Sequence, residues 1–117
     1  MSERNTVFAI DAFVEDSSIE WELLGDGVKR KIMSYDERLM LVKVAFEKDA
    51  IGTLHHHPHT QISYVSKGAF EVEIDGEKKL LKAGDVFYAA PGLLHGVVCL
   101  EEGELVDMFS PYREDFV

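Results

Sequence analysis

The sequence predicts an all-β domain built as a jelly-roll barrel, and two observations lead to that prediction. Ten short apolar or alternating runs follow one another between residues 19 and 109, separated by turns that contain glycine or aspartate. No window repeats apolar residues with the 3.6-residue period of a helix. So many short strands in one small chain have to close or double over to hide their edges, which favours a two-sheet barrel.

The expected strands follow from alternation and from the turn residues between them. The clearest is 69–75, whose apolar side chains alternate with acidic ones, so that one face is core and the other solvent. Asp75-Gly76 supplies the two positive-φ residues of a type I′ turn, so the next run should return antiparallel. In chain order the strands are 19–24, 28–35, 39–48, 52–57, 61–67, 69–75, 77–82, 85–90, 95–100 and 104–109, with turns that include Lys67-Gly68 and Glu102-Gly103.

The two ends of the chain carry weaker patterns. Phe8 to Phe13 is the candidate for a short helix before the first strand, and Pro111 to Val117 is expected to cross the barrel surface. Residues 1–117 should form a single domain, because 46% hydrophobic content is enough for one core. Cys99 is the single cysteine and lies in an apolar run, which predicts a buried thiol and a reducing compartment.

The charge balance excludes several classes of partner. The chain carries 22 acidic and 12 basic residues, a formal net charge of −10, which repels nucleic-acid phosphates and anionic membrane surfaces. No stretch approaches the roughly 20 apolar residues of a membrane span, and no apolar signal segment follows Met1, which predicts a cytoplasmic protein. An anionic ligand would have to be captured at a local positive site.

Four of the five histidines lie within residues 53–59, and the fifth is His95. A solvated polar loop is the simpler interpretation of such a run, because histidine tolerates intermediate burial. In a strand, however, His55 and His57 share a face while His56 points away. Two imidazoles at that spacing can bind one metal ion, so the pattern predicts a metal site.

The strand pattern leaves the remaining ligands open. Pro58 disturbs the alternation, so either His59 or Gln61 could return to the same centre. Imidazole-rich sites suit zinc, nickel, iron and copper and tolerate manganese, so the residues do not select the metal.

The spacing of these residues resembles the two motifs of the cupin family. The first motif, within 52–68, is carried by Gly52, His55-His56-His57, Gln61 and Gly68. The second, within 84–99, is carried by Gly84, Pro91-Gly92 and His95. The resemblance implies the cupin double-stranded β-helix and one divalent metal ion, zinc, nickel, iron or manganese, with the ligands His55, His57, Gln61 and His95.

Gln61 stands where the first cupin motif has an acid. Three neutral imidazoles and a neutral amide leave the 2+ charge of an ion uncompensated, whereas a glutamate would cancel part of it. The site therefore becomes the local positive trap that the acidic chain otherwise lacks. This chemistry favours a Lewis acid that binds an oxyanion or stabilises an enolate over an iron oxygenase, whose metal is often tuned by a carboxylate ligand.

A narrower resemblance involves residues 105–116, together with 55–65 and 40–42. These segments resemble the small cupins known as pectin-degradation proteins, and the likeness covers most of the chain from Trp21 to Phe116. It implies an enzyme that converts 4,5-unsaturated monouronates, released by pectate or alginate lyases, to linear keto-uronates by ring opening and enol-to-ketone tautomerisation. It also implies three further active-site positions, Asp107, Phe109 and Arg113.

On this resemblance the three positions take separate roles. Asp107 would shuttle a proton, Arg113 would pair with the substrate carboxylate, and Phe109 would pack against the sugar and exclude water. The simpler interpretations are that Asp107 reaches water near the strand end, and that Arg113 forms a surface ion pair with Glu114 or Asp115.

Two other functions share the same barrel, a metal-dependent dioxygenase and a non-catalytic sugar-binding cupin. The expected partner is a small anionic sugar substrate, and the sequence leaves open whether His59 or Tyr64 contacts it. A homodimer is expected, because small barrels with exposed edge strands often pair.

Overall fold

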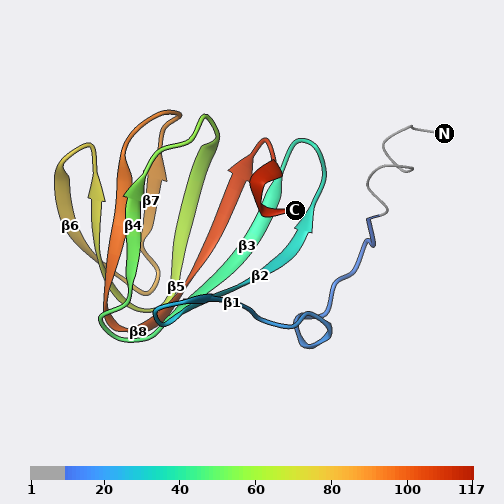
Figure 1. Ribbon diagram of the computed structural model, residues 1–117, viewed down its shortest axis with the longest axis horizontal. Coiled ribbons are helices and arrows are strands. Elements are labelled where there is room, and N and C mark those ends of the chain that lie inside the picture. The colour runs from blue at the N-terminus through green and yellow to red at the C-terminus, as the bar shows by residue number, and fades with distance from the viewer. Residues whose placement is uncertain (1–9) are drawn as a thin grey trace.

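Backbone hydrogen bonds in the described residues form eight strands and two short 3-10 turns (Figure 1). The structure is a computed structural model that describes residues 10–117. Strands dominate it, which confirms the all-β prediction. The elements are η1 Asp16–Ser18, β1 Glu22–Gly25, β2 Val28–Tyr35, β3 Met40–Phe46, β4 Ile51–His55, β5 Thr60–Ile74, β6 Glu77–Lys82, β7 Val86–Ala89, β8 His95–Ser110 and η2 Glu114–Phe116.

The two longest strands, β5 and β8, bend and take part in both layers of the barrel (Figure 1). In one layer, β1, β2, β3, the C-terminal half of β8, the N-terminal half of β5 and β7 lie in that order. In the other layer, β4, the N-terminal half of β8, the C-terminal half of β5 and β6 follow one another. All of these pairs are antiparallel, which gives the predicted double-sheet jelly roll.

The bends in β5 and β8 correct the expected number of strands. Turns were predicted at Lys67-Gly68 and Glu102-Gly103, but both pairs lie inside continuous strands. The pairing register of β5 with β8 shifts between Val65 and Phe70, so the two strands bend together. Gly68 has a φ of 81°, and a Cβ atom on it would lie 2.5 Å from the Glu101 carbonyl oxygen. These glycines therefore allow two backbones to touch at a corner and do not end a strand.

We expect Gly68→Ala to destabilise the protein far more than Gly76→Ala. Both glycines have positive φ, 81° and 86°, so each alanine is strained by roughly 1 kcal/mol. At Gly76 no atom lies within 4 Å of the added Cβ, whereas at Gly68 backbone oxygens lie at 2.5 and 2.6 Å. Overpacking against backbone should bring the loss at Gly68 to about 3 kcal/mol or more in urea unfolding. Equal losses would show that the corner is not tightly packed.

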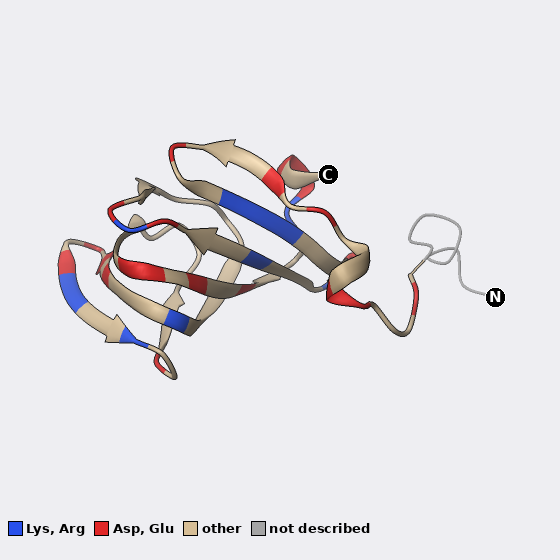
Figure 2. Cartoon of the chain, turned by 90° about the horizontal axis from the view of Figure 1, so that it is seen from below, with Lys and Arg blue, Asp and Glu red and all other residues tan. Residues whose placement is uncertain are grey.

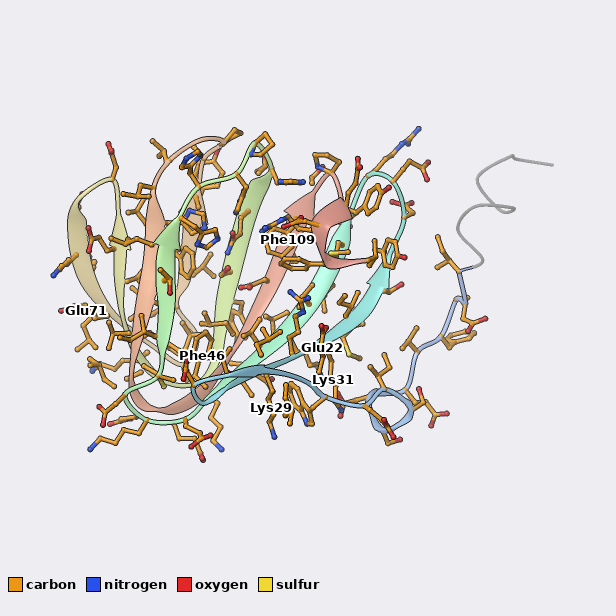
Figure 3. The ribbon with its side chains drawn as sticks, viewed as in Figure 1. Glu22, Lys29, Lys31, Phe46, Glu71 and Phe109 are labelled. Atoms are coloured by element: carbon orange, nitrogen blue, oxygen red, sulfur yellow. The ribbon has the colours of Figure 1, made fainter. Side chains whose placement is uncertain are left out.

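Inward-facing residues of the three central strands form layers along the barrel. The layer at one end is apolar, the next contains a carboxylate and a hydroxyl, and the last contains an amide. The three sets are Val44, Leu105 and Val65, then Val42, Asp107 and Ser63, then Met40, Phe109 and Gln61. The core accordingly splits into a larger cluster around Phe46 and a smaller one around Phe109, which Figure 3 shows toward opposite ends of the interior. The polar layers lie at the Phe109 end.

The segment before β1 lies across the outer face of β2 and β3. Lys31 Nζ donates to the Asp16 carbonyl oxygen at 3.0 Å, and Lys43 Nζ lies 3.1 Å from the Asp16 carboxylate. The Lys31 ammonium also lies over the Trp21 ring. Figure 2 shows the basic run of β2 in blue. These contacts fix the segment by charge rather than by a large apolar surface.

The helix expected over residues 8–13 is not found in the part that can be compared. Phe8 and Ala9 lie outside the described residues, and 10–13 have no helical hydrogen bonding. Within residues 10–117 no helix is long and apolar enough to cross a membrane. Cys99 is fully buried, as predicted.

Candidate metal centre

Three histidines from separate segments converge at one end of the barrel. His55 ends β4 and His95 begins β8, and the two are direct partners across the antiparallel pair. His57 lies in the loop after β4, where its carbonyl oxygen accepts a hydrogen bond from Gly92 N–H at 2.8 Å. One ring nitrogen of each histidine lies within 4.8 Å of the other two, a spacing that can hold a metal ion. His57 and His95 are buried, so a solvated loop does not describe them.

Each of these histidines has one ring nitrogen fixed by a backbone carbonyl. Nδ1 of His55 lies 2.8 Å from Thr53 O, and Nδ1 of His95 lies 3.0 Å from Leu93 O. Nδ1 of His57 lies 3.1 Å from the carbonyl oxygen of His59. A carbonyl oxygen only accepts, so the proton of a neutral ring belongs on Nδ1. Each Nε2 is then an unprotonated donor of an electron pair, as a metal ligand requires.

Gln61 brings an oxygen to the same point. It begins the buried part of β5, and its Oε1 lies 2.9 Å from His57 Nε2 and 3.0 Å from His95 Nε2. These atoms are all acceptors when the rings are neutral, so nothing in the protein alone bonds them to one another. Burial lowers the pKa of both His57 and His95, which keeps protons off these rings. A bound cation satisfies the three lone pairs at once, so the residues fit the metal that the cupin motifs imply.

Asp107 is connected to this centre through one hydroxyl group. Ser63 Oγ donates to Asp107 Oδ1 at 2.6 Å and accepts from Gln61 Nε2 at 2.9 Å. Asp107 lies on β8 directly opposite Ser63, is half-buried and accepts the Ser63 hydrogen bond, so it does not simply reach water as the simpler interpretation assumed. Sequence reasoning missed Ser63. The available signal was its place two residues after Gln61 on a strand whose inward positions are otherwise apolar.

Burial raises the pKa of Asp107 to about 6, although the Ser63 hydroxyl and the Arg113 charge both lower it. The carboxyl group keeps a little accessible surface but is enclosed by the barrel, so removal from water is the largest influence. A carboxylic acid with this pKa exchanges its proton close to neutral pH, as a general acid or base must.

The ionisation of Asp107 should make the protein less stable as the pH rises. Its pKa in the folded protein lies above the value of 3.8 in the unfolded chain, so the protonated carboxyl group favours folding. That contribution to the free energy of unfolding is complete below pH 3.8 and is lost as the pH rises through 6. We expect metal-free Asp107→Asn to be more stable than the parent protein by about 3 kcal/mol at pH 8, and by roughly half as much at pH 5. Urea unfolding of both proteins at the two pH values measures the difference. A difference independent of pH would contradict the raised pKa.

Phe109 and Arg113 were expected to contact the substrate, but both side chains are buried. Phe109 is 2% exposed and packs its ring against His57 at 5.8 Å between centroids. The Arg113 guanidinium lies over the rings of Phe109 and Phe116, at 5.1 and 4.3 Å. It is bound at both Nε and Nη2 by the Asp115 carboxylate, at 3.0 and 2.8 Å.

The C-terminal segment exposes Pro111, Glu114, Asp115 and Val117 at the surface, but it packs Arg113 and Phe116 inward against Phe109. Arg113 is 7% exposed, and Phe116 meets Phe109 edge to face at 5.7 Å. The ion pair with Asp115 exists, but Arg113 is not the surface residue that the simpler interpretation assumed. Hydrogen bonding to Arg113 lowers the pKa of Asp115, so the pair is charged at neutral pH.

The two further candidates for substrate contact, His59 and Tyr64, differ in their position relative to the histidines. His59 lies 5.3 Å from His57 between ring centroids, and its buried Nδ1 has no hydrogen-bond partner within residues 10–117. Tyr64 is 41% exposed on the opposite face of β5 and so points away from the centre. A groove of about 570 Å³ beneath β1, lined by Trp21 and Lys29 among others, includes none of the predicted site residues.

Comparison with known proteins agrees with this geometry. The cupin domain family matches residues 42–109. Over 107 residues the chain is 54% identical to the pectin degradation protein KdgF of Dickeya dadantii (strain 3937), a match that covers 90% of this chain and 96% of that protein.

Solved structures give the same result. KdgF from Halomonas sp. superposes with a TM-score of 0.88 at 42% identity, over 92% of this chain and 99% of that one. An RmlC-like cupin from Shewanella frigidimarina NCIMB 400 gives 0.89 at 46% identity, over 92% and 96%. A predicted oxalate decarboxylase from Thermotoga maritima, at 17% identity and a TM-score of 0.75, covers 86% and 99% and shares the fold alone. The chain belongs to the cupin family and, within it, to the family of the pectin degradation protein KdgF.

Proposed function

We propose that this protein takes part in pectin or alginate breakdown by converting 4,5-unsaturated monouronates to linear keto-uronates. The observation that carries the proposal is a carboxyl group, Asp107, with a pKa of about 6, joined by one hydroxyl to a centre of neutral ligands. That combination suits capture of an anionic sugar and transfer of a proton on it. The relationship to KdgF supports the substrate class.

The four proposed ligands of a divalent metal ion are His55, His57, Gln61 and His95. When bound there, the ion would supply Lewis-acid polarisation of a substrate oxygen, with its 2+ charge uncompensated by the ligands.

Asp107 is the proposed proton carrier. Ring opening breaks the bond between C1 and the ring oxygen, which leaves an aldehyde at C1 and an enol at C5. Asp107 would then accept the enol proton and return a proton to C4, so that the C5–oxygen bond becomes a carbonyl. Atoms and electrons balance in this isomerisation, so it needs no oxidant or reductant.

Arg113 is the proposed partner of the substrate carboxylate. Asp115 accepts from Nε and from one N–H of Nη2, so both N–H groups of Nη1 and the second N–H of Nη2 are the donors for a second carboxylate. Phe109 would act by holding the His57 ring and the Arg113 guanidinium in place, because its own surface is almost fully covered. His59, with its free Nδ1, is the better placed of the two further candidates for substrate contact.

One assay tests the reaction and separates the alternatives. Purified protein loaded with zinc or nickel is mixed, without dioxygen, with unsaturated monouronate made by a lyase, and the loss of ultraviolet absorbance is compared with the spontaneous rate. Acceleration is expected. A requirement for dioxygen and ferrous iron would indicate the dioxygenase, and sugar binding without acceleration would indicate the binding module.

We also propose that the protein acts in the cytoplasm as a homodimer. The edge strand β1 supports pairing, because it exposes the apolar side chains of Leu23 and Leu24, at 79% and 46%. Light scattering should give twice the monomer mass of 13.2 kDa. The monomer mass at micromolar concentration would remove the dimer and leave the enzymatic proposal untouched.

A further inference from the structure

We propose that Ser63 is a positioning residue that determines which end of the Gln61 amide faces the three histidines. Nothing in the sequence motifs assigns a role to this serine. The inference rests on the proposed cation site, but its test measures cation binding and amide orientation and does not depend on the uronate reaction.

Ser63 lies between Gln61 and Asp107 and is completely enclosed. It is two residues beyond Gln61 on β5, so the two side chains share the inward face. Its exposed fraction is 0%, and the hydroxyl contacts Gln61 Nε2 at 2.9 Å and Asp107 Oδ1 at 2.6 Å. Gln61 is also buried, at 5% exposed, so its NH2 group would lose its hydrogen-bond acceptor if the serine hydroxyl were removed.

The Ser63 hydroxyl has a single hydrogen, and this sets the direction of both hydrogen bonds in the series from Gln61 through Ser63 to Asp107. An ionised Asp107 can only accept, so Ser63 must donate to it. Ser63 is then left with lone pairs, and only the NH2 end of Gln61 can donate to them. Oε1 is consequently turned toward His57 and His95, where it lies 2.9 and 3.0 Å from their Nε2 atoms.

The metal-free site by itself favours the opposite orientation. With Nδ1 of each ring protonated, the Nε2 lone pairs would be better matched by the NH2 end of Gln61 than by its oxygen. An amide turned by 180° would donate to the histidines and block the position of a cation. The short bond between Ser63 and Asp107 opposes that rotation, because the rotated amide would place an oxygen against a hydroxyl that has no second hydrogen to give.

A double-mutant cycle tests this role through cation affinity. Zinc binding is measured by competition with a chromophoric chelator for the parent protein, Ser63→Ala, Gln61→Glu and the double variant. We expect Ser63→Ala to weaken binding about 10- to 100-fold in the parent, the range found for residues that orient a ligand. In the Gln61→Glu background the same substitution should change affinity by no more than about threefold, because both ends of a carboxylate are oxygens.

Ser66→Ala is the matched control. Ser66 lies on the same strand, is exposed, and contacts only Glu104 through its hydroxyl among the described residues, so its loss should leave zinc affinity unchanged. Equal losses for Ser63→Ala in both backgrounds would assign Ser63 to packing alone. No loss in the parent protein would overturn the inference directly.

A second measurement needs no substitution and so does not depend on whether a variant folds. In the metal-free parent protein, the NH2 protons of Gln61 should give nuclear Overhauser contacts to Ser63 and not to the ring protons of His57 or His95. Contacts to the histidine rings would show the rotated amide and overturn the proposal. Failure of the uronate assay with the expected orientation and affinities would remove the proposed reaction alone.

Discussion

Asp107→Asn is expected to slow the decay of unsaturated uronate absorbance by about 10²- to 10⁴-fold while cation content stays unchanged. Asparagine keeps the size of the side chain and can still accept the Ser63 hydrogen bond, but it cannot exchange a proton. The substitution removes a group whose pKa of about 6 suits transfer near neutrality, and it touches none of the proposed ligands. Stopped-flow absorbance with metal analysis of the same samples measures both quantities.

Asp26→Asn is the matched control for this prediction. Asp26 is exposed in the β1–β2 turn, with a φ of 53° that asparagine also tolerates. The nearby Val28 pairs with Phe46, at the end of the barrel opposite Phe109 and the histidines, so the same change of charge is made away from the site. Its rate should equal that of the parent protein. An unchanged rate in Asp107→Asn would leave the barrel as a binding module, and a parallel loss of metal would show that Asp107 acts on the site rather than on the substrate.

Side-chain alternation and turn residues predicted the strands whose bounds depend only on the local sequence. The β5–β6 hairpin has the predicted turn, with Asp75 and Gly76 both at positive φ and Ile74 opposite Glu77. The same rules failed at Gly68, because a glycine in a turn and a glycine at a bend where two strands touch look alike in sequence. Only the long-range pairing of β5 with β8 distinguishes them.

The site shows a similar division. Strand alternation predicted that His55 and His57 share a face, and their rings do converge, although β4 ends at His55 and the loop after it positions His57. The second motif supplied His95. Ser63 carries no such signal, since a serine on a strand is ordinary unless its neighbours across the sheet are known. The burial of Arg113 could not be predicted, because it depends on Phe109 and Phe116, which only the folded C-terminal segment brings together.

The candidate metal centre contains groups that lower the stability of the metal-free protein. Asp107 lowers stability when ionised, and the unprotonated Nε2 atoms of His57 and His95 face an amide oxygen that cannot bond them. A protein selected only for stability would replace these groups with apolar residues, as the neighbouring layer of Val44, Val65 and Leu105 does. Their retention is expected where binding and proton transfer use them.

His95→Ala is expected to abolish the rise in melting temperature that zinc gives to the chelator-treated protein. His95 is 3% exposed and supplies a lone pair to the same point as His57 and Gln61, so its loss leaves an incomplete ligand set. Zinc at 100 times its dissociation constant stabilises a protein by about 2.7 kcal/mol, and affinity reduced more than about a hundredfold would leave well under 1 kcal/mol at that concentration. Differential scanning fluorimetry with and without zinc measures the change.

His56→Ala is the control that shows whether zinc binding depends on the position of a histidine or only on the number of histidines. His56 is exposed and adjacent to two of the three converging rings, yet it is not among the residues whose ring nitrogens meet. It should therefore keep the full zinc-dependent shift, and its uronate rate should match the parent protein. If His56→Ala and His95→Ala lost the shift equally, zinc would be bound by the histidine-rich loop and not by the centre inside the barrel, and the ligand set built on Gln61 would fall with it.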